Sequence, residues 1–205
     1  MTKRLATLAL AAALGLAAGA QAAVIGFDSA DQQGGALAVG DSVTAGGFNF
    51  TLTSVAPAVL FAGDLTGAYA SNGSPSLFAD GSAVIEITAV GGLRFNFGGF
   101  ELGGGNLGDT TTWAAGVTLV ADSGSGTVAR SFAIDPGNMG LTAFNMVQGN
   151  LQKLTVIPVS FTADGVSYSL DNLNLSAVPE PSVWALSLLG LLALNGALRR
   201  RRAAD

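Results

Sequence analysis

The chain has 205 residues, a length typical of one domain, with 9 basic and 14 acidic side chains, 29 glycines, no cysteine and no histidine. The missing cysteine excludes disulfides and thiolate nucleophiles, and the missing histidine excludes a Ser-His-Asp triad and a His-ligated zinc site. Hydrophobic residues make up 49% of the chain and charged residues only 11%, which indicates that some apolar residues serve a membrane.

The N-terminus has the three parts of a secretory signal peptide. Lys3-Arg4 precedes an apolar run over residues 5–20, and the small residues Ala20 and Ala22 suit a signal peptidase. We expect cleavage after Ala22, which leaves Ala23 as the new N-terminus and makes residues 1–22 the signal peptide. A retained N-terminal anchor is the alternative, and the cleavage site disfavours it.

The middle of the chain is acidic and rich in glycine. Residues 23–178 carry 3 basic and 12 acidic side chains, a net charge of −9, and they contain 25 of the 29 glycines. Binding to nucleic acid needs clustered Lys and Arg, so we expect no nucleic-acid partner, and anionic lipid surfaces are disfavoured for the same reason.

Alternating apolar and polar residues predict short strands in this region. Turn signals such as Asp164-Gly165 separate them, and the glycine clusters at 98–99 and 103–105 read as bends. Residues 161–175 predict a hairpin that turns at Asp164-Gly165. The pattern indicates one all-β domain over 23–176, a β-sandwich or jelly roll. The predicted strands cover residues 47–53, 83–88, 93–97, 117–121, 127–134, 153–163 and 166–175.

The C-terminus begins with Val178-Pro179-Glu180-Pro181 and continues with an uncharged apolar run over 182–198. Seventeen residues in a helix rise roughly 25 Å, the lower limit for crossing a bilayer core. Four arginines, Arg199, Arg200, Arg201 and Arg202, follow the run and should stay on the cytoplasmic side. We therefore predict a transmembrane helix over 182–198, with the β domain outside the inner membrane.

This arrangement over 177–205 resembles the PEP-CTERM sorting signal of exported bacterial proteins. The resemblance implies that the helix holds the precursor in the membrane while the protease/transpeptidase exosortase acts near Pro179–Pro181. The released domain would then move to the cell surface or extracellular matrix. A plain tail anchor that is never cut is the alternative, because the physics of spanning is the same.

The stretch Leu170-Asp171-Asn172-Leu173 looks like the closing strand of jelly-roll modules related to carbohydrate-binding domains. That resemblance implies a structural calcium ion shared by a carboxylate on this strand and one near the first strand. The matching residues are Asp171 and Asp28, with Asp31 as a further oxygen donor. The alternative is that these carboxylates only bond neighbouring backbone amides in turns.

Carbohydrate contact would need aromatic rings at the surface, and Trp113 and Tyr69 are the candidates. A single tryptophan in a sandwich also suits the core. Hydrolysis would need two carboxylates, and Glu86 and Glu101 are the only glutamates of the domain. Both lie in alternating sequence where an outward charge is ordinary, so we expect no catalytic residue.

The sequence thus predicts an exported, non-enzymatic surface or matrix protein, sorted through its C-terminal signal. A lectin-like carbohydrate-binding module of the surface or biofilm matrix is the alternative. Signal peptidase, exosortase and the inner membrane are the expected processing partners, with exopolysaccharide as a further one. Calcium is the only cofactor that the sequence suggests.

Overall fold

The computed structural model describes residues 23–27, 37–54, 59–63, 69–160 and 166–178, together with Gly190, Leu191 and Leu194. The chain divides into two compact units, one over Ala22–Ala177 and the other formed by Met1–Gln21 with Val178–Asp205. Gly190, Leu191 and Leu194 are helical. Within the described ranges, no helix has the length and apolar character needed to cross a membrane.

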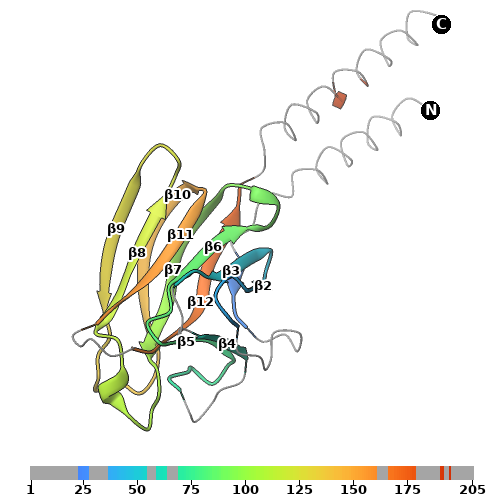
Figure 1. Ribbon diagram of the computed structural model, residues 1–205. Helices are drawn as coiled ribbons and strands as arrows, with labels where there is room; N and C mark the ends of the chain where they lie inside the picture. The colour runs from blue at the N-terminus through green and yellow to red at the C-terminus, as the bar shows by residue number, and fades with distance from the viewer. Residues whose placement is uncertain are drawn as a thin grey trace, which may run out of the picture. The chain divides into compact units, whose positions relative to one another are not determined.

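The described part of the unit Ala22–Ala177 consists of two antiparallel sheets, so the prediction of an all-β, sandwich-like fold is confirmed (Figure 1). Sheet A has the order β10 (Thr142–Leu151), β7 (Phe95–Gly104), β12 (Tyr168–Ala177), β5 (Ser76–Asp80) and β4 (Val59–Gly63), with β1 (Ala23–Ile25) also on β12. Sheet B has the order β2 (Ser42–Ala45), β3 (Phe48–Leu52), β6 (Ile85–Ala89), β11 (Lys153–Val159), β8 (Gly116–Asp122) and β9 (Thr127–Ala133). Two short 3₁₀ turns, η2 (Val90–Gly92) and η3 (Thr110–Thr112), complete the described elements.

Aromatic side chains join the two sheets across the core. Phe48 of sheet B meets Phe95 of sheet A edge to face with ring centroids 5.4 Å apart. Phe100 of sheet A meets Phe132 of sheet B in the same way at 5.1 Å. Each fully buried large apolar side chain stabilises the fold by about 1.5–3 kcal/mol, so these rings hold the sheets face to face.

The alternation expected in the clearest strands is present. In β3 the residues Phe48, Phe50 and Leu52 are buried and the residues between them are half-buried. In β6 the side chains of Ile85 and Ile87 are buried while Glu86 lies on the outer face. These strands are recognisable from sequence because one face is apolar at every second position.

The interpretation of the glycine clusters as bends is wrong for Gly98, Gly99, Gly103 and Gly104, which all lie within β7. Neighbouring groups occupy the space that their Cβ atoms would need. A Cβ on Gly104 would lie 2.0 Å from ring atoms of Trp113, and one on Gly99 would lie 2.6 Å from the Phe144 carbonyl oxygen. Glycine in a strand here permits close approach of another segment.

The first arm and the turn of the hairpin predicted at Asp164-Gly165 lie outside the described residues. The described strands on either side are in different sheets, β11 in sheet B and β12 in sheet A. β12 is an inner strand of sheet A. It pairs with β7 along its length, while its other edge pairs with β5 through Tyr168–Leu170 and with β1 through Leu173–Leu175. Asn172, with φ of 49°, lies between these two pairings and marks an irregularity in the register with β7. The closing strand is therefore fixed from both sides.

The buried hydrogen bond of Tyr168 can be tested by substitution. Its side chain is fully buried and its hydroxyl donates a 2.7 Å hydrogen bond to the Ala83 carbonyl, and burial raises the pKa of the phenol. Replacing Tyr168 with phenylalanine leaves that carbonyl without its partner, so we expect a loss of about 1–2 kcal/mol in the free energy of unfolding. Denaturant unfolding at 25 °C measures it, and an unchanged free energy would contradict the assigned bond.

Candidate functional site

A polar cluster lies on the outer face of sheet A, where β7 and β12 run side by side. Asp171 of β12 and Glu101 of β7 are directly opposite each other in the register. Asp171 is fully buried and Glu101 is half-buried. Two carboxylates placed opposite each other repel when both are ionised, so this arrangement is costly without a compensating partner.

The turn before β5 supplies two neutral side chains to this cluster. The Ser74 hydroxyl lies 2.8 Å from Asp171 Oδ2 and also within reach of Asn72 Oδ1. The Asn72 amide nitrogen donates a 2.8 Å hydrogen bond to Glu101 Oε2. Because a hydroxyl has one proton, Ser74 can donate to Asp171 or to Asn72 at one time but not to both.

The second oxygen of Asp171 is left without compensation. Asp171 Oδ1 is buried and has no hydrogen-bond partner among the described residues, and the same holds for Ser169 Oγ two residues earlier. Burial raises the pKa of Asp171, while the nearby Asn172 backbone amide and the side chains of Ser74 and Asn72 act in the opposite direction. Leaving a buried carboxylate oxygen unpaired is unfavourable, so a positive group beside this oxygen would stabilise the ionised cluster.

The cluster brings together four oxygen-bearing side chains, those of Asp171, Glu101, Asn72 and Ser74, two of them carboxylates. Calcium prefers six to eight oxygen ligands and readily takes carboxylates, amide oxygens and hydroxyls. Within the described residues no group of three or more His, Cys, Asp or Glu side chains could hold a metal. Asp28, the expected partner of Asp171, and Asp31 lie outside the described residues, although Phe27 just before them is fully buried in the core.

Sequence reasoning singled out Asp171 but missed its three neighbours. In the sequence, Glu101 looks like an ordinary outward-facing charge, and Ser71-Asn72-Gly73-Ser74 gives only the signal of a turn. Ser74 and Asp171 are 97 positions apart in the chain. Their contact depends on the order of the strands in sheet A, where β5 lies beside β12. An Asn-Gly-Ser turn gives no local signal for such a contact.

A shallow groove continues from this cluster over the outer face of sheet A. It consists of two adjoining hollows of about 400 and 410 Å³, which share Gly98 and Asn174. Its lining comes from β7, β10 and β12, which are neighbours in the sheet order β10, β7, β12, together with Val24 of β1. The polar residues that line it are Asn96, Glu101, Asn145, Gln148, Asn172, Asn174 and Ser176.

The two aromatic candidates for sugar contact lie elsewhere. Trp113 is 7% exposed, and its indole nitrogen donates a 2.7 Å hydrogen bond to the Asn106 carbonyl. Trp113 is one of the residues that line a hollow of about 440 Å³, whose other lining residues are mainly small or apolar. Tyr69 is half-buried, with its ring centroid 3.7 Å from that of Phe78. Both arrangements favour a packing role.

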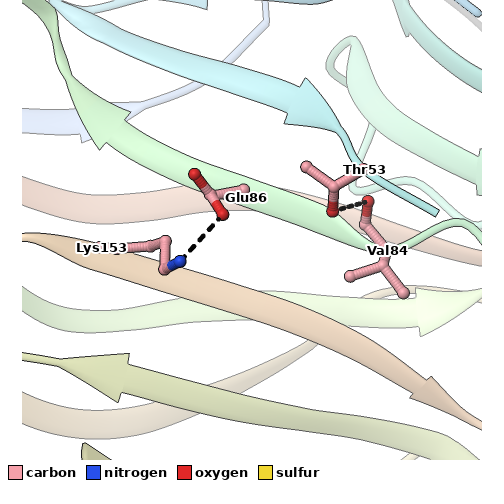
Figure 2. A network of polar contacts seen from close by, with 4 residues as sticks. All are labelled: Thr53, Val84, Glu86 and Lys153. Atoms are coloured by element: carbon pink, nitrogen blue, oxygen red, sulfur yellow. Dashed lines mark hydrogen bonds and ion pairs between the residues drawn. The ribbon is translucent and has the colours of Figure 1, made fainter. Parts of the chain in front are cut away.

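The two glutamates of the domain are in different sheets. Glu86 lies on the outer face of sheet B, where its Oε2 forms a 3.1 Å ion pair with Lys153 Nζ of β11, as Figure 2 shows. Close to it, the Thr53 hydroxyl donates a 3.3 Å hydrogen bond to the Val84 carbonyl (Figure 2). Since Glu101 lies on sheet A, the structure does not bring these carboxylates together as a pair.

Most residues of the predicted processing sites lie outside the described part of the chain. This holds for Ala20 and Ala22 at the signal cleavage site, for Pro179, Glu180 and Pro181, and for Arg199 to Arg202. Ala23 is described as the exposed first residue of β1, and Val178 as a half-buried residue directly after β12.

No family model matches the chain, and no curated protein matches it either. Among solved structures, it is similar to an arabinose-bound MgGH51 α-L-arabinofuranosidase, with 11% identity and a TM-score of 0.46 over 77% of this chain. It is also similar to the enzymatically active domain of tailspike protein 4 of bacteriophage CBA120, with 12% identity and a TM-score of 0.36 over 65% of this chain. The matches span only 27% and 20% of those two chains.

Proposed function

We propose that this chain is the precursor of an exported, non-enzymatic surface or matrix protein that is sorted through its C-terminal segment. The observation that carries the proposal is the order of three features over residues 178–202. A Pro-Glu-Pro motif precedes an uncharged apolar run of spanning length, and four arginines follow it. The basic, apolar and small-residue parts of residues 1–22 support export of the same chain.

The arrangement of carboxylates supports a role without catalysis. Glu86 is ion-paired on one sheet, and Glu101 is hydrogen-bonded to Asn72 on the other. Asp171 is opposite Glu101 but fully buried, so it has no surface with which to contact a substrate. A glycosidase needs two accessible carboxylates that flank the bond to be broken, and neither Glu86 with Glu101 nor Glu101 with Asp171 forms such a pair.

Mass spectrometry of the protein recovered from the cell surface tests the sorting step. The full chain is expressed in a bacterium that has an exosortase, and the same strain without exosortase is the control. We expect a mature C-terminus near Pro179–Pro181 in the first strain, and a membrane-bound chain that keeps its arginines in the second. Intact peptides that span Pro181 to Arg199 in the surface-exposed product would contradict processing.

Replacing Pro179, Glu180 and Pro181 together with alanine separates sorting from anchoring. We expect this variant to remain in the membrane fraction of the exosortase strain, because the apolar run and the arginines are unchanged. Release of the variant equal to that of the unaltered chain would contradict a role for the motif.

A further inference from the structure

The groove on the outer face of sheet A has the features of a built binding surface. Its floor is backbone, because glycines stand where side chains would fill it. A Cβ on Gly98 would lie 3.0 Å from the Asn174 amide nitrogen, and a Cβ on Gly149 would lie 3.3 Å from Asn96 Oδ1. The amide side chains of Asn174 and Asn96 therefore lie low over these glycines, and they form much of the surface that a ligand would meet.

Three asparagines of the groove have unused hydrogen-bonding capacity. Within the described residues, the side chains of Asn145, Asn172 and Asn174 have no hydrogen-bond partner. Each offers two N–H donors and a carbonyl acceptor. Asn172 and Asn174 are half-buried, so part of this capacity faces the groove and not bulk water. The groove thus presents groups that both donate and accept.

The charge of the groove limits what it can bind. Among the described residues that line it there is no lysine or arginine, and their one carboxylate, that of Glu101, already accepts a hydrogen bond from Asn72. An anionic ligand would find no cation here and would meet a domain with excess acidic charge. A cationic ligand would find one partly compensated carboxylate at one end. The lining therefore favours a neutral, polar ligand.

The sheet topology argues against an extended peptide. A peptide that binds by strand addition pairs its backbone with the free edge of a sheet. The groove lies over a sheet face, and the backbones of β7 and β12 beneath it are paired on both sides. β10, which also lines the groove, is the edge strand, but the hydrogen-bonding groups of a strand edge point sideways in the plane of the sheet and not over its face. Recognition must then come from the amide side chains, whose natural complements are hydroxyl groups that also donate and accept.

We propose that this groove binds a neutral oligosaccharide. Successive hydroxyls of the chain hydrogen-bond to Asn145, Asn172 and Asn174, while its C–H groups lie against the glycine floor and against Val24, which is 62% exposed. This site is separate from Trp113 and Tyr69, and it does not depend on the sorting route proposed above. Either proposal can fail while the other holds.

Titration calorimetry of the full chain tests the inference, in a detergent without a sugar headgroup. The probes are cellohexaose, laminarihexaose and chitohexaose as neutral chains, with hexagalacturonic acid and hexa-alanine as the alternatives. We expect at least one neutral chain to bind. The proposal is overturned if none of the three binds at millimolar concentration, or if only the acidic chain or the peptide binds.

Two substitutions locate the site. Asn172→Gly removes the side-chain amide, and glycine tolerates the left-handed backbone conformation at this position. Asn174→Ala removes the amide that lines both hollows of the groove. We expect each substitution to weaken the affinity for the oligosaccharide about three- to tenfold. The control Gln152→Ala removes an exposed amide outside the groove and should leave the affinity unchanged. Thermal melts show whether each variant is folded. A folded Asn174→Ala that binds as tightly as the unaltered chain would overturn the assignment.

Discussion

Calcium is expected to raise the melting temperature of the chain, and Asp171→Asn is expected to abolish that rise. Asp171 Oδ1 is buried beside Glu101 and has no hydrogen-bond partner among the described residues, so a cation at this point would compensate two opposed carboxylates. A ligand present at a hundred times its dissociation constant stabilises by about 2.7 kcal/mol, which corresponds to an increase of about 5–10 °C in a domain of this size. Far-UV circular dichroism melts, after chelator treatment and after calcium addition, measure it.

Asparagine at position 171 keeps the shape of the side chain while removing its charge, so the variant isolates the electrostatic contribution. The matched control is Asp135→Asn, an exposed carboxylate in a turn far from the cluster in sequence, and it should keep the full response to calcium. Magnesium should have a smaller effect, because it requires a tighter octahedral set of ligands. Melting curves that coincide with and without calcium would rule out the ion, and the cluster would then be a purely hydrogen-bonded one.

Gly104→Ala is expected to destabilise the domain more than most single methyl additions would. The added Cβ would lie 2.0 Å from carbon atoms of the Trp113 ring, which is itself fixed by its bond to the Asn106 carbonyl. The ring has to move, and overpacking of this kind costs about 1–3 kcal/mol. We expect the melting temperature to fall by about 3–10 °C.

Two further variants make that result specific. Gly126→Ala adds the same methyl group in an exposed turn where nothing lies within 4 Å, so it should leave the melting temperature nearly unchanged. Trp113→Leu removes the obstructing ring, and in the double variant the additional loss caused by Gly104→Ala should largely disappear. Equal effects of the glycine substitution with and without the ring would show that the assigned packing is not the cause.

The fold class could be predicted because apolar residues at every second position leave a local trace. Phe48, Phe50, Ile85 and Ile87 mark their strands without any knowledge of partners. β10 has no clear alternation of apolar and polar residues, because it lies at the sheet edge and only its Met146 and Leu151 are buried. The glycine-rich half of β7 has too few side chains to show such an alternation. Those elements depend on tertiary neighbours, as the close approach of Trp113 to Gly104 illustrates.

The candidate site could be predicted only in part for a related reason. Asp171 is a carboxylate in an otherwise apolar and amide-rich strand, which is visible in the sequence. Its burial and its placement opposite Glu101 follow from the pairing of β12 with β7, and the contribution of Ser74 follows from the path of the turn before β5. Which distant strands pair is determined by packing in the assembled core, so a short stretch of sequence does not predict it.

The place of β12 within sheet A has a mechanical consequence. This strand leads directly to Val178, and its ladder pairs it with β7 on one side and with β5 and β1 on the other. A tension transmitted along the strand from its C-terminal end, with the rest of the domain held, loads the hydrogen bonds of these ladders in shear. Under shear these hydrogen bonds must break together, whereas a strand pulled away from a sheet edge loses its hydrogen bonds one at a time. β12 should therefore resist a pull applied at its C-terminal end better than an edge strand would.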